Sequence, residues 1–207
     1  MNIPYEYCAY RFLELWERGE KQLHEFMSET PSAGQVRLAL KYFRVARNFK
    51  GLSDGTAEEI SKALIEVSDD REASPPDKVV LLASRFKVSF NQSNVSAASK
   101  LLWLRNRSPH LIYDSRAVNA LCRLGKKFDK ADYLAYCGAW LEEYKKRSDE
   151  ISLAARGLIT LPREYTAAFE LTDCELTQIV NSDWFLERVF DIYLWETGKT
   201  VASDKSE

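Results

Sequence analysis

Apolar residues recur at helical spacing along nearly the whole chain, and this periodicity constrains the fold more than any other feature. Cys8, Phe12, Leu15 and Leu23 are separated by four, three and eight residues, so they share one face of a helix. Comparable stripes follow as far as the C-terminal region. A short extended piece is expected only at 86–90, where apolar and polar residues alternate. We therefore predict an all-α protein.

Capping residues indicate where several helices begin and end. Thr30 is followed by a proline, which suits the first position of a helix. The run 74–77 (Ser-Pro-Pro-Asp) interrupts one helix and starts the next. Thr172 and Glu175 have the spacing of a capping box, and Gly198 follows the last apolar stripe. These signals divide the chain into short helices rather than one long coil.

The chain of 207 residues with 45% hydrophobic content can bury a core without disulfides. We expect residues 1–200 to form one helical domain, or two lobes around a cleft near 90–120, and 201–207 to form a disordered tail. The four cysteines are scattered, which predicts reduced thiols in a cytoplasmic protein and no metal site. No signal peptide and no bilayer-length apolar run are present, so we expect a soluble protein without a membrane partner.

Basic residues are concentrated in two parts of the chain, although the net charge is only -2. Ten Lys or Arg lie against two acids between Ser84 and Lys130, an excess of +8. A second run without acids consists of Lys41, Arg44, Arg47 and Lys50. Such runs are usually solvated helix faces, but they are also what a phosphate-binding surface requires.

The segment 91–121 carries the residue types with the clearest chemistry. A polar turn at 91–94 leads directly into a helix of small residues that becomes apolar at Leu101. A loop containing Pro109 follows, and a new helix is expected to begin at Asp114. A turn that enters a helix presents free backbone N–H groups, which bind a DNA phosphate without reading sequence.

This segment resembles the hairpin and catalytic aspartate of the helix-hairpin-helix DNA glycosylases. In that superfamily a Gly-Val-Gly type of turn leads a helix, and some twenty residues later an aspartate opens the next one. In this resemblance, residues 94–96 (Asn-Val-Ser) correspond to the turn, and residues 112–118 correspond to the segment that contains the aspartate. The chain is more similar still to bacterial 8-oxoguanine-DNA-glycosylase-like proteins, because it contains Ala-Ser-Lys at 98–100 and Asp-Ser-Arg at 114–116.

The resemblance implies a helix-hairpin-helix glycosylase-like fold and a DNA N-glycosylase that extrudes a base and cuts its bond to deoxyribose. The substrate it suggests is 8-oxoguanine, or a phage hypermodified base such as glucosylated hydroxymethylcytosine in an anti-phage role. No cofactor is needed, and the expected partner is double-stranded DNA bound by a monomer. Asp114 would be the essential carboxylate and Lys100 a nucleophile that forms a Schiff base. The expected DNA contacts are Ser93, Asn94, Ser96, Arg105, Arg107 and Arg116, and the expected base pocket consists of Trp103, Tyr113, Tyr136 and Trp140, with Trp184 as a further candidate.

Each of these residues has a structural alternative. Asp114 has the type and position of an ordinary helix N-cap, and Lys100 could lie on a solvent-facing surface. The aromatic residues suit a core as well as a pocket. Two glycines of the family turn are replaced by Asn94 and Ser96, and only fourteen residues separate Lys100 from Asp114, so lyase activity is left open. The alternative functions are a non-catalytic helix-hairpin-helix DNA-binding module and a helical protein-interaction domain.

Overall fold

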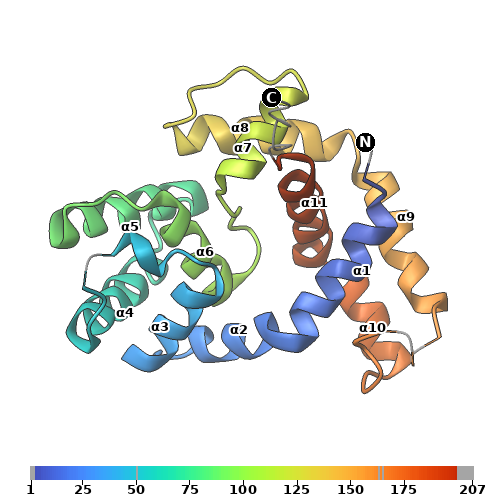
Figure 1. Ribbon diagram of the computed structural model, residues 1–207, viewed down its shortest axis with the longest axis horizontal. Coiled ribbons are helices and arrows are strands. Elements are labelled where there is room, and N and C mark those ends of the chain that lie inside the picture. The colour runs from blue at the N-terminus through green and yellow to red at the C-terminus, as the bar shows by residue number, and fades with distance from the viewer. Residues whose placement is uncertain (1–2, 50, 163, 165, 200–207) are drawn as a thin grey trace, which may run out of the picture.

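The computed structural model describes residues 3–49, 51–162, 164 and 166–199, and the regular elements of these residues are all helical (Figure 1). The predicted all-α class is confirmed. The expected extended piece at 86–90 is wrong, because it is the end of helix α5 (Pro75–Phe90). Phe86 and Phe90 lie four residues apart, and both rings contact Phe49, while Val88 is 88% exposed between them. The expected tail 201–207 lies outside the described residues.

The N-terminal helix changes its winding part-way along. Helix α1 (Tyr5–Leu15) passes through a π-helical turn, η1 (Trp16–Glu20), directly into α2 (Lys21–Ser28). The result is one continuous but bent helical stretch that extends along both halves of the molecule (Figure 1). π-Turns inside helices are rare and often occur at functional sites. This turn buries Glu20 to 1% exposure, which a charged residue tolerates only with partners.

One group of helices, which includes α2, packs around α6 (Val95–Asn106). Its other members are α3 (Ala33–Tyr42), α4 (Asp54–Ser68) and α5, with a 3-10 turn η2 (Ala46–Asn48) between α3 and α4. Ser74 caps α5 by accepting from the Asp77 backbone N–H, as the sequence indicates. Helix α3 begins later than expected, because Ser32 rather than Thr30 forms the capping box, with Gln35.

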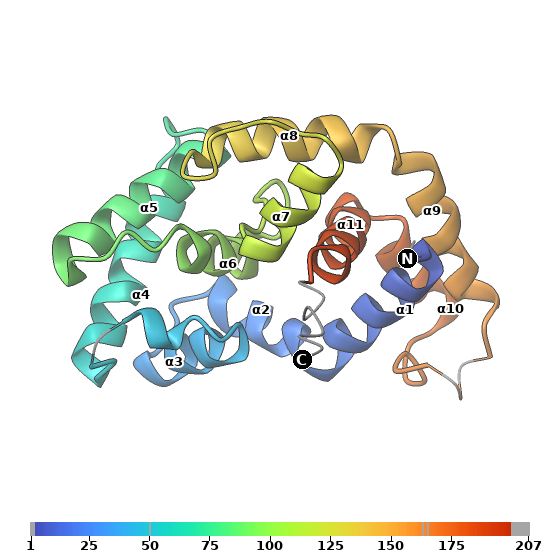
Figure 2. The same cartoon turned by 45° about the horizontal axis from the view of Figure 1, so that its top comes forward.

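The second group packs around α11 (Asp183–Thr197), which contacts α1, α7 and α9. Its other members are α7 (Ser115–Arg123), α8 (Tyr133–Lys145), α9 (Ser148–Gly157), the 3-10 turn η3 (Leu158–Thr160) and α10 (Asp173–Val180). Thr172 and Glu175 form the predicted capping box of α10, and Gly198 ends α11. Helix α8 bridges the two groups, since it contacts both α5 and α7 (Figure 2).

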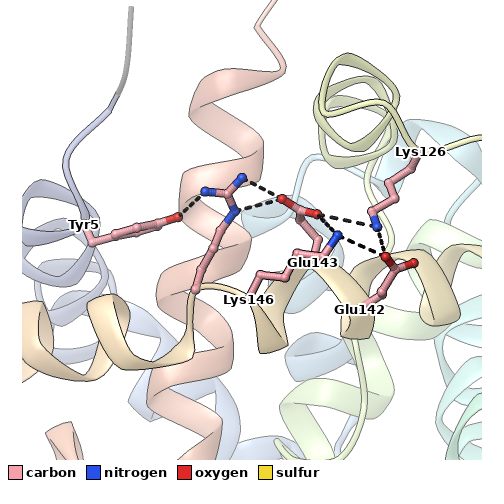
Figure 3. A network of polar contacts seen from close by, with 6 residues as sticks. Tyr5, Lys126, Glu142, Glu143 and Lys146 are labelled. Carbon is pink, nitrogen blue, oxygen red and sulfur yellow. Dashed lines mark hydrogen bonds and ion pairs between the residues drawn. The ribbon is translucent and has the colours of Figure 1, made fainter.

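A network of charged side chains fixes α8 to its neighbours (Figure 3). The Glu143 carboxylate is 4% exposed and accepts from Arg147, with Nη2 at 2.6 Å from Oε1. Arg147 also donates to the Tyr5 hydroxyl of α1, and Lys126, which follows α7, lies 3.5 Å from Glu143. Because the carboxylate is buried and has several donors, the network holds α1, α8 and the end of α7 in one relation.

Within the described parts of the chain, no helix has both the length and the apolar character needed to cross a bilayer.

Candidate functional site

A cavity of about 660 Å³ lies between the two groups of helices. Its walls come from α1 and the π-turn, the stretch 42–48, the start of α6, residues 112–117 and one face of α11. Two exposed arginines of the stretch 42–48, Arg44 and Arg47, belong to this wall. Both are part of the acid-free basic run that the sequence shows. The cavity therefore joins a charged surface to a deeper, largely buried interior.

The segment that leads to Asp114 is held in place through its backbone. The hydroxyl of Tyr133 donates to the Leu111 carbonyl at 2.6 Å, and that of Tyr136 donates to the Ile112 carbonyl at 2.8 Å. On the other side, the Ser99 hydroxyl accepts from the Tyr113 N–H at 2.9 Å. These bonds pin the irregular chain between α6 and α7 on both sides. They explain how residues fourteen apart in the sequence are brought into contact.

Lys100 and Asp114 form an ion pair at the cavity wall. The Lys100 ammonium lies 3.0 Å from Asp114 Oδ2 and donates to Ser96 Oγ at 2.9 Å. The second Asp114 oxygen, Oδ1, accepts from the Arg116 N–H at 3.0 Å and caps α7. Asp114 is therefore the predicted N-cap and also the partner of Lys100. Lys100 is 5% exposed, so the alternative of a solvent-facing lysine is wrong.

Burial changes the acid–base character of this pair. Loss of hydration lowers the pKa of Lys100, and the neighbouring Asp114 carboxylate opposes that effect only in part. A lysine with a lowered pKa is more often in the amine form, which is nucleophilic. Burial also raises the pKa of Tyr113, so this cavity-lining phenol stays protonated at neutral pH and its hydroxyl donates to the Lys130 carbonyl.

The turn between α5 and α6 has its left-handed residue before 94–96, the residues that correspond to the family turn. The left-handed residue is Asn91, with φ of 55°, whereas Asn94 has φ of -109°. The Asn94 amide donates to the Asn48 carbonyl, and the Asn94 side chain makes no hydrogen bond that caps the start of α6. A second, open cavity of about 410 Å³ lies at this turn and includes exposed Ser93. The first backbone N–H groups of α6 are thus not satisfied by the residue at its N-cap.

The three predicted DNA-binding arginines have different surroundings. Arg116 stacks on the Trp195 ring at 4.2 Å and belongs to the cavity wall. Arg105 donates to the carbonyls of Met27 and Glu29 at the end of α2, so its guanidinium is used within the fold. Arg107 lies 4.6 Å from the Trp184 ring, outside the cavity wall. Of the three, the structure brings only Arg116 to the site.

The predicted pocket aromatics divide in the same way. Tyr113 lines the cavity, but Trp103, Tyr136 and Trp140 are core residues with at most 1% exposure. Their rings pack on neighbours instead: Trp103 on Phe12, and Trp140 on Tyr144. These three residues take the core alternative, whereas Trp184 is half-buried and packs against the edge of the core. Their polar atoms still act on the site, because Tyr136 and Trp140 donate to groups that line it.

A buried polar cluster completes the cavity wall, and the sequence interpretation missed it. Arg188 of α11 donates to Glu20 of the π-turn at 2.9 Å, and the Tyr42 hydroxyl donates to the same carboxylate oxygen. Asp191 lies one turn beyond Arg188 and accepts from the Trp140 indole at 2.9 Å. A signal was present, since Arg188 and Asp191 interrupt the apolar stripe of the last helix.

No protein-family model, curated protein or solved structure matches the chain. The described residues also contain no group of three or more His, Cys, Asp or Glu side chains arranged to hold a metal ion.

Proposed function

We propose that the chain is a DNA N-glycosylase, with Asp114 as the essential carboxylate and Lys100 as its nucleophile. The observation that carries the proposal is the buried Lys100–Asp114 pair, joined at 3.0 Å, on the wall of a 660 Å³ cavity. Pockets that bind small molecules usually have volumes of about 300–1,000 Å³. The cavity lies within this range and is therefore large enough for one extruded nucleotide. A base within a duplex must leave the stack to reach such a site.

The charges around the cavity suit a DNA strand. Exposed Arg44 and Arg47 lie on its wall, and the uncapped start of α6 offers backbone N–H groups next to Arg47. Arginine side chains and helix N-termini are typical ligands of backbone phosphates. These groups would fix the strand without reading its sequence. The interior residues would then act on the base and its sugar.

The chemistry follows from the ion pair. The proton that Lys100 must lose can pass to Asp114 Oδ2, and the free amine can bond to the sugar C1′ as the C1′–N bond to the base breaks. In the hydrolytic route, a water oxygen bonds to C1′ and Asp114 takes the water proton. In both routes, Asp114 stabilises the positive charge that develops on the sugar while it is still a carboxylate, before the proton reaches it. The product is an abasic site, reached directly or through a Schiff base.

The test is incubation of the protein with duplexes that contain oxidised, deaminated, alkylated or glucosylated bases, followed by measurement of free base and abasic sites. We expect the Asp114→Asn variant to lose at least 100-fold in excision rate, the scale of an acid–base or charge-stabilising group. Asp129→Asn is the matched control, because Asp129 is exposed and also accepts from a backbone N–H two residues ahead. If no base is released from any of these duplexes, the proposal that the protein is a DNA N-glycosylase is refuted.

Borohydride trapping tests the nucleophile separately. A Schiff base between protein and sugar is reduced to a stable adduct, which we expect in the wild type and not in Lys100→Ala. An adduct that persists in Lys100→Ala would exclude this lysine as the nucleophile while leaving Asp114 in its role.

A non-catalytic DNA-binding module is the second candidate. It is favoured by the use of both Asp114 oxygens within the fold, one for capping α7 and one for pairing with Lys100. Such a module would bind duplex DNA with a steep salt dependence and release no base.

A further inference from the structure

A second carboxyl group, that of Asp191, belongs to the same cavity as Lys100 and Asp114. It comes from α11, on a different element from either of them. Oδ1 is fixed by the hydrogen bond from the Trp140 indole at 2.9 Å. Asp191 is 6% exposed, and within the described residues no basic side chain lies at ion-pair distance from it. The nearest cation along its helix, Arg188, is committed to Glu20.

We propose that Asp191 is the general acid of the glycosylase reaction, which donates its proton to the base as the base leaves. The inference rests on the proposed function. The C1′–N electron pair goes to the departing base, which takes the Asp191 proton. The sugar carbon receives a water oxygen or the Lys100 nitrogen, and Asp114 takes the proton released from that nucleophile. In the lysine route, water then hydrolyses the Schiff base and releases the Lys100 amine. Solvent reprotonates Asp191 and deprotonates Asp114, so the sum of either route is hydrolysis.

The two carboxyl groups have the different environments that such a division of labour needs. Asp114 pairs with Lys100 and accepts a backbone N–H, whereas Asp191 accepts only from the neutral Trp140 indole among the hydrogen bonds of the described residues. Burial raises the pKa of Asp191 to about 7, against the opposing effects of Arg188 and the Trp140 hydrogen bond. Asp191 is thus a neutral acid in a large part of the molecules at neutral pH. A general acid works best with a pKa near the working pH.

Titration of Asp191 is coupled to groups on each element around it. The charged groups of α11 that act on Asp191 are Arg188 and Glu187. The charged groups that act on it from the cavity wall are Lys100 of α6 and Asp114 at the start of α7. From α8 the groups are Tyr133, Tyr136 and Cys137, whose pKa values are all raised by burial, so they stay neutral in the range where Asp191 titrates.

The decisive variant is Asp191→Asn. Its amide oxygen can still accept from Trp140, so the packing is kept, but the amide has no proton to give. We expect the single-turnover rate of base release to fall about 100-fold or more, with duplex affinity unchanged. The wild-type rate should decline above about pH 7 as Asp191 ionises, and this decline should be missing in the variant. A halogenated derivative of the excised base, which leaves more readily, should show a smaller defect.

Glu187→Gln is the matched control. Glu187 lies on the same helix, and burial raises its pKa to about 7, but it does not line the cavity. This variant should keep the wild-type rate at low pH and still show the decline. Because the Glu187 charge raises the pKa of Asp191, its loss should move that decline to lower pH without removing it. Trp140→Phe provides a second measurement if Asp191→Asn folds poorly. Because the indole hydrogen bond lowers the pKa of Asp191, its removal should move the decline in rate to higher pH.

The outcomes separate the two proposals. If the wild type excises bases and Asp191→Asn does so at the same rate with the same pH profile, the general-acid role is overturned and the glycosylase stands. A decline above pH 7 that disappears in Glu187→Gln rather than in Asp191→Asn would overturn it too. If the wild type releases no base, both proposals fail together.

Discussion

Gly198 allows the end of α11 to touch the first turn of α7, and its replacement by alanine is the sharpest test of how the site is assembled. A Cβ atom at position 198 would lie 1.9 Å from the Arg116 carbonyl oxygen and 2.6 Å from its carbon. Non-bonded heavy atoms prefer separations of about 3.5–4.0 Å. The obstacle is backbone, which cannot rotate away as a side chain would. Gly198→Ala must therefore push α11 and α7 apart.

The expected loss of stability is about 1–3 kcal/mol or more, the usual cost of overpacking. For a chain of this size each kcal/mol corresponds to about 2–4 °C in melting temperature, so we expect a decrease of about 2–12 °C. The displaced backbone is two residues from Asp114, whose Oδ1 accepts from the Arg116 N–H. Base excision should therefore fall in Gly198→Ala even below its melting temperature.

Thermal unfolding followed by circular dichroism measures the first effect. Gly138→Ala is the control, since Gly138 lies within α8 and its added Cβ would meet no atom within 4 Å. Alanine is the better helix former by about 0.5–1 kcal/mol, so this control should melt at or above the wild-type temperature. A Gly198→Ala protein that melts within 1 °C of the wild type would show that the helices do not approach each other in this way.

Three further predictions concern the same region. Ser99→Ala should cost about 1–3 kcal/mol in chemical denaturation, because it leaves the Tyr113 N–H without its acceptor; an unchanged midpoint would contradict that bond. Folding raises the pKa of Asp191 from 3.8 to about 7, so this group should lower stability as pH rises from about 4 to about 7, and Asp191→Asn should remove that part of the slope; equal slopes for the two proteins in that range would refute it. Arg47→Ala should weaken duplex binding and reduce the slope of log affinity against log salt by about one, whereas an identical slope would remove Arg47 from the phosphate contacts.

The sequence predicted secondary structure well wherever a local signal determined it. Helical periodicity gave the all-α class, and the caps at Ser74 and Thr172 occur as expected, because capping depends on residues three positions apart. It predicted wrongly where two local signals competed. Thr30 was expected to cap α3, but Ser32 caps it instead, because Gln35 completes a capping box with Ser32. The alternation at 86–90 proved to be two phenylalanines spaced one helical turn apart.

The candidate site shows the same division. Asp114 could be identified as a helix start because an aspartate before an apolar stripe is a local pattern, and the sequence drew attention to Lys100 through the adjacent motif. The contact between Lys100 and Asp114 depends on Ser99 of α6 and on Tyr133 and Tyr136 of α8. Their hydroxyl groups bond to the backbone of the chain between α6 and α7 and hold it in place. No spacing rule encodes such long-range hydrogen bonds.

By itself, the sequence determined the helical class, several helix ends and the residue types available for chemistry, because these follow from periodicity and from bonds between near neighbours. Only the tertiary structure decided which of those residues meet. It put Trp103 and Trp140 in the core, used Arg105 to finish α2, and brought Asp191 to the cavity of Lys100 from the far end of the chain. The physical reason is that burial and ion pairing depend on which helix faces are packed together.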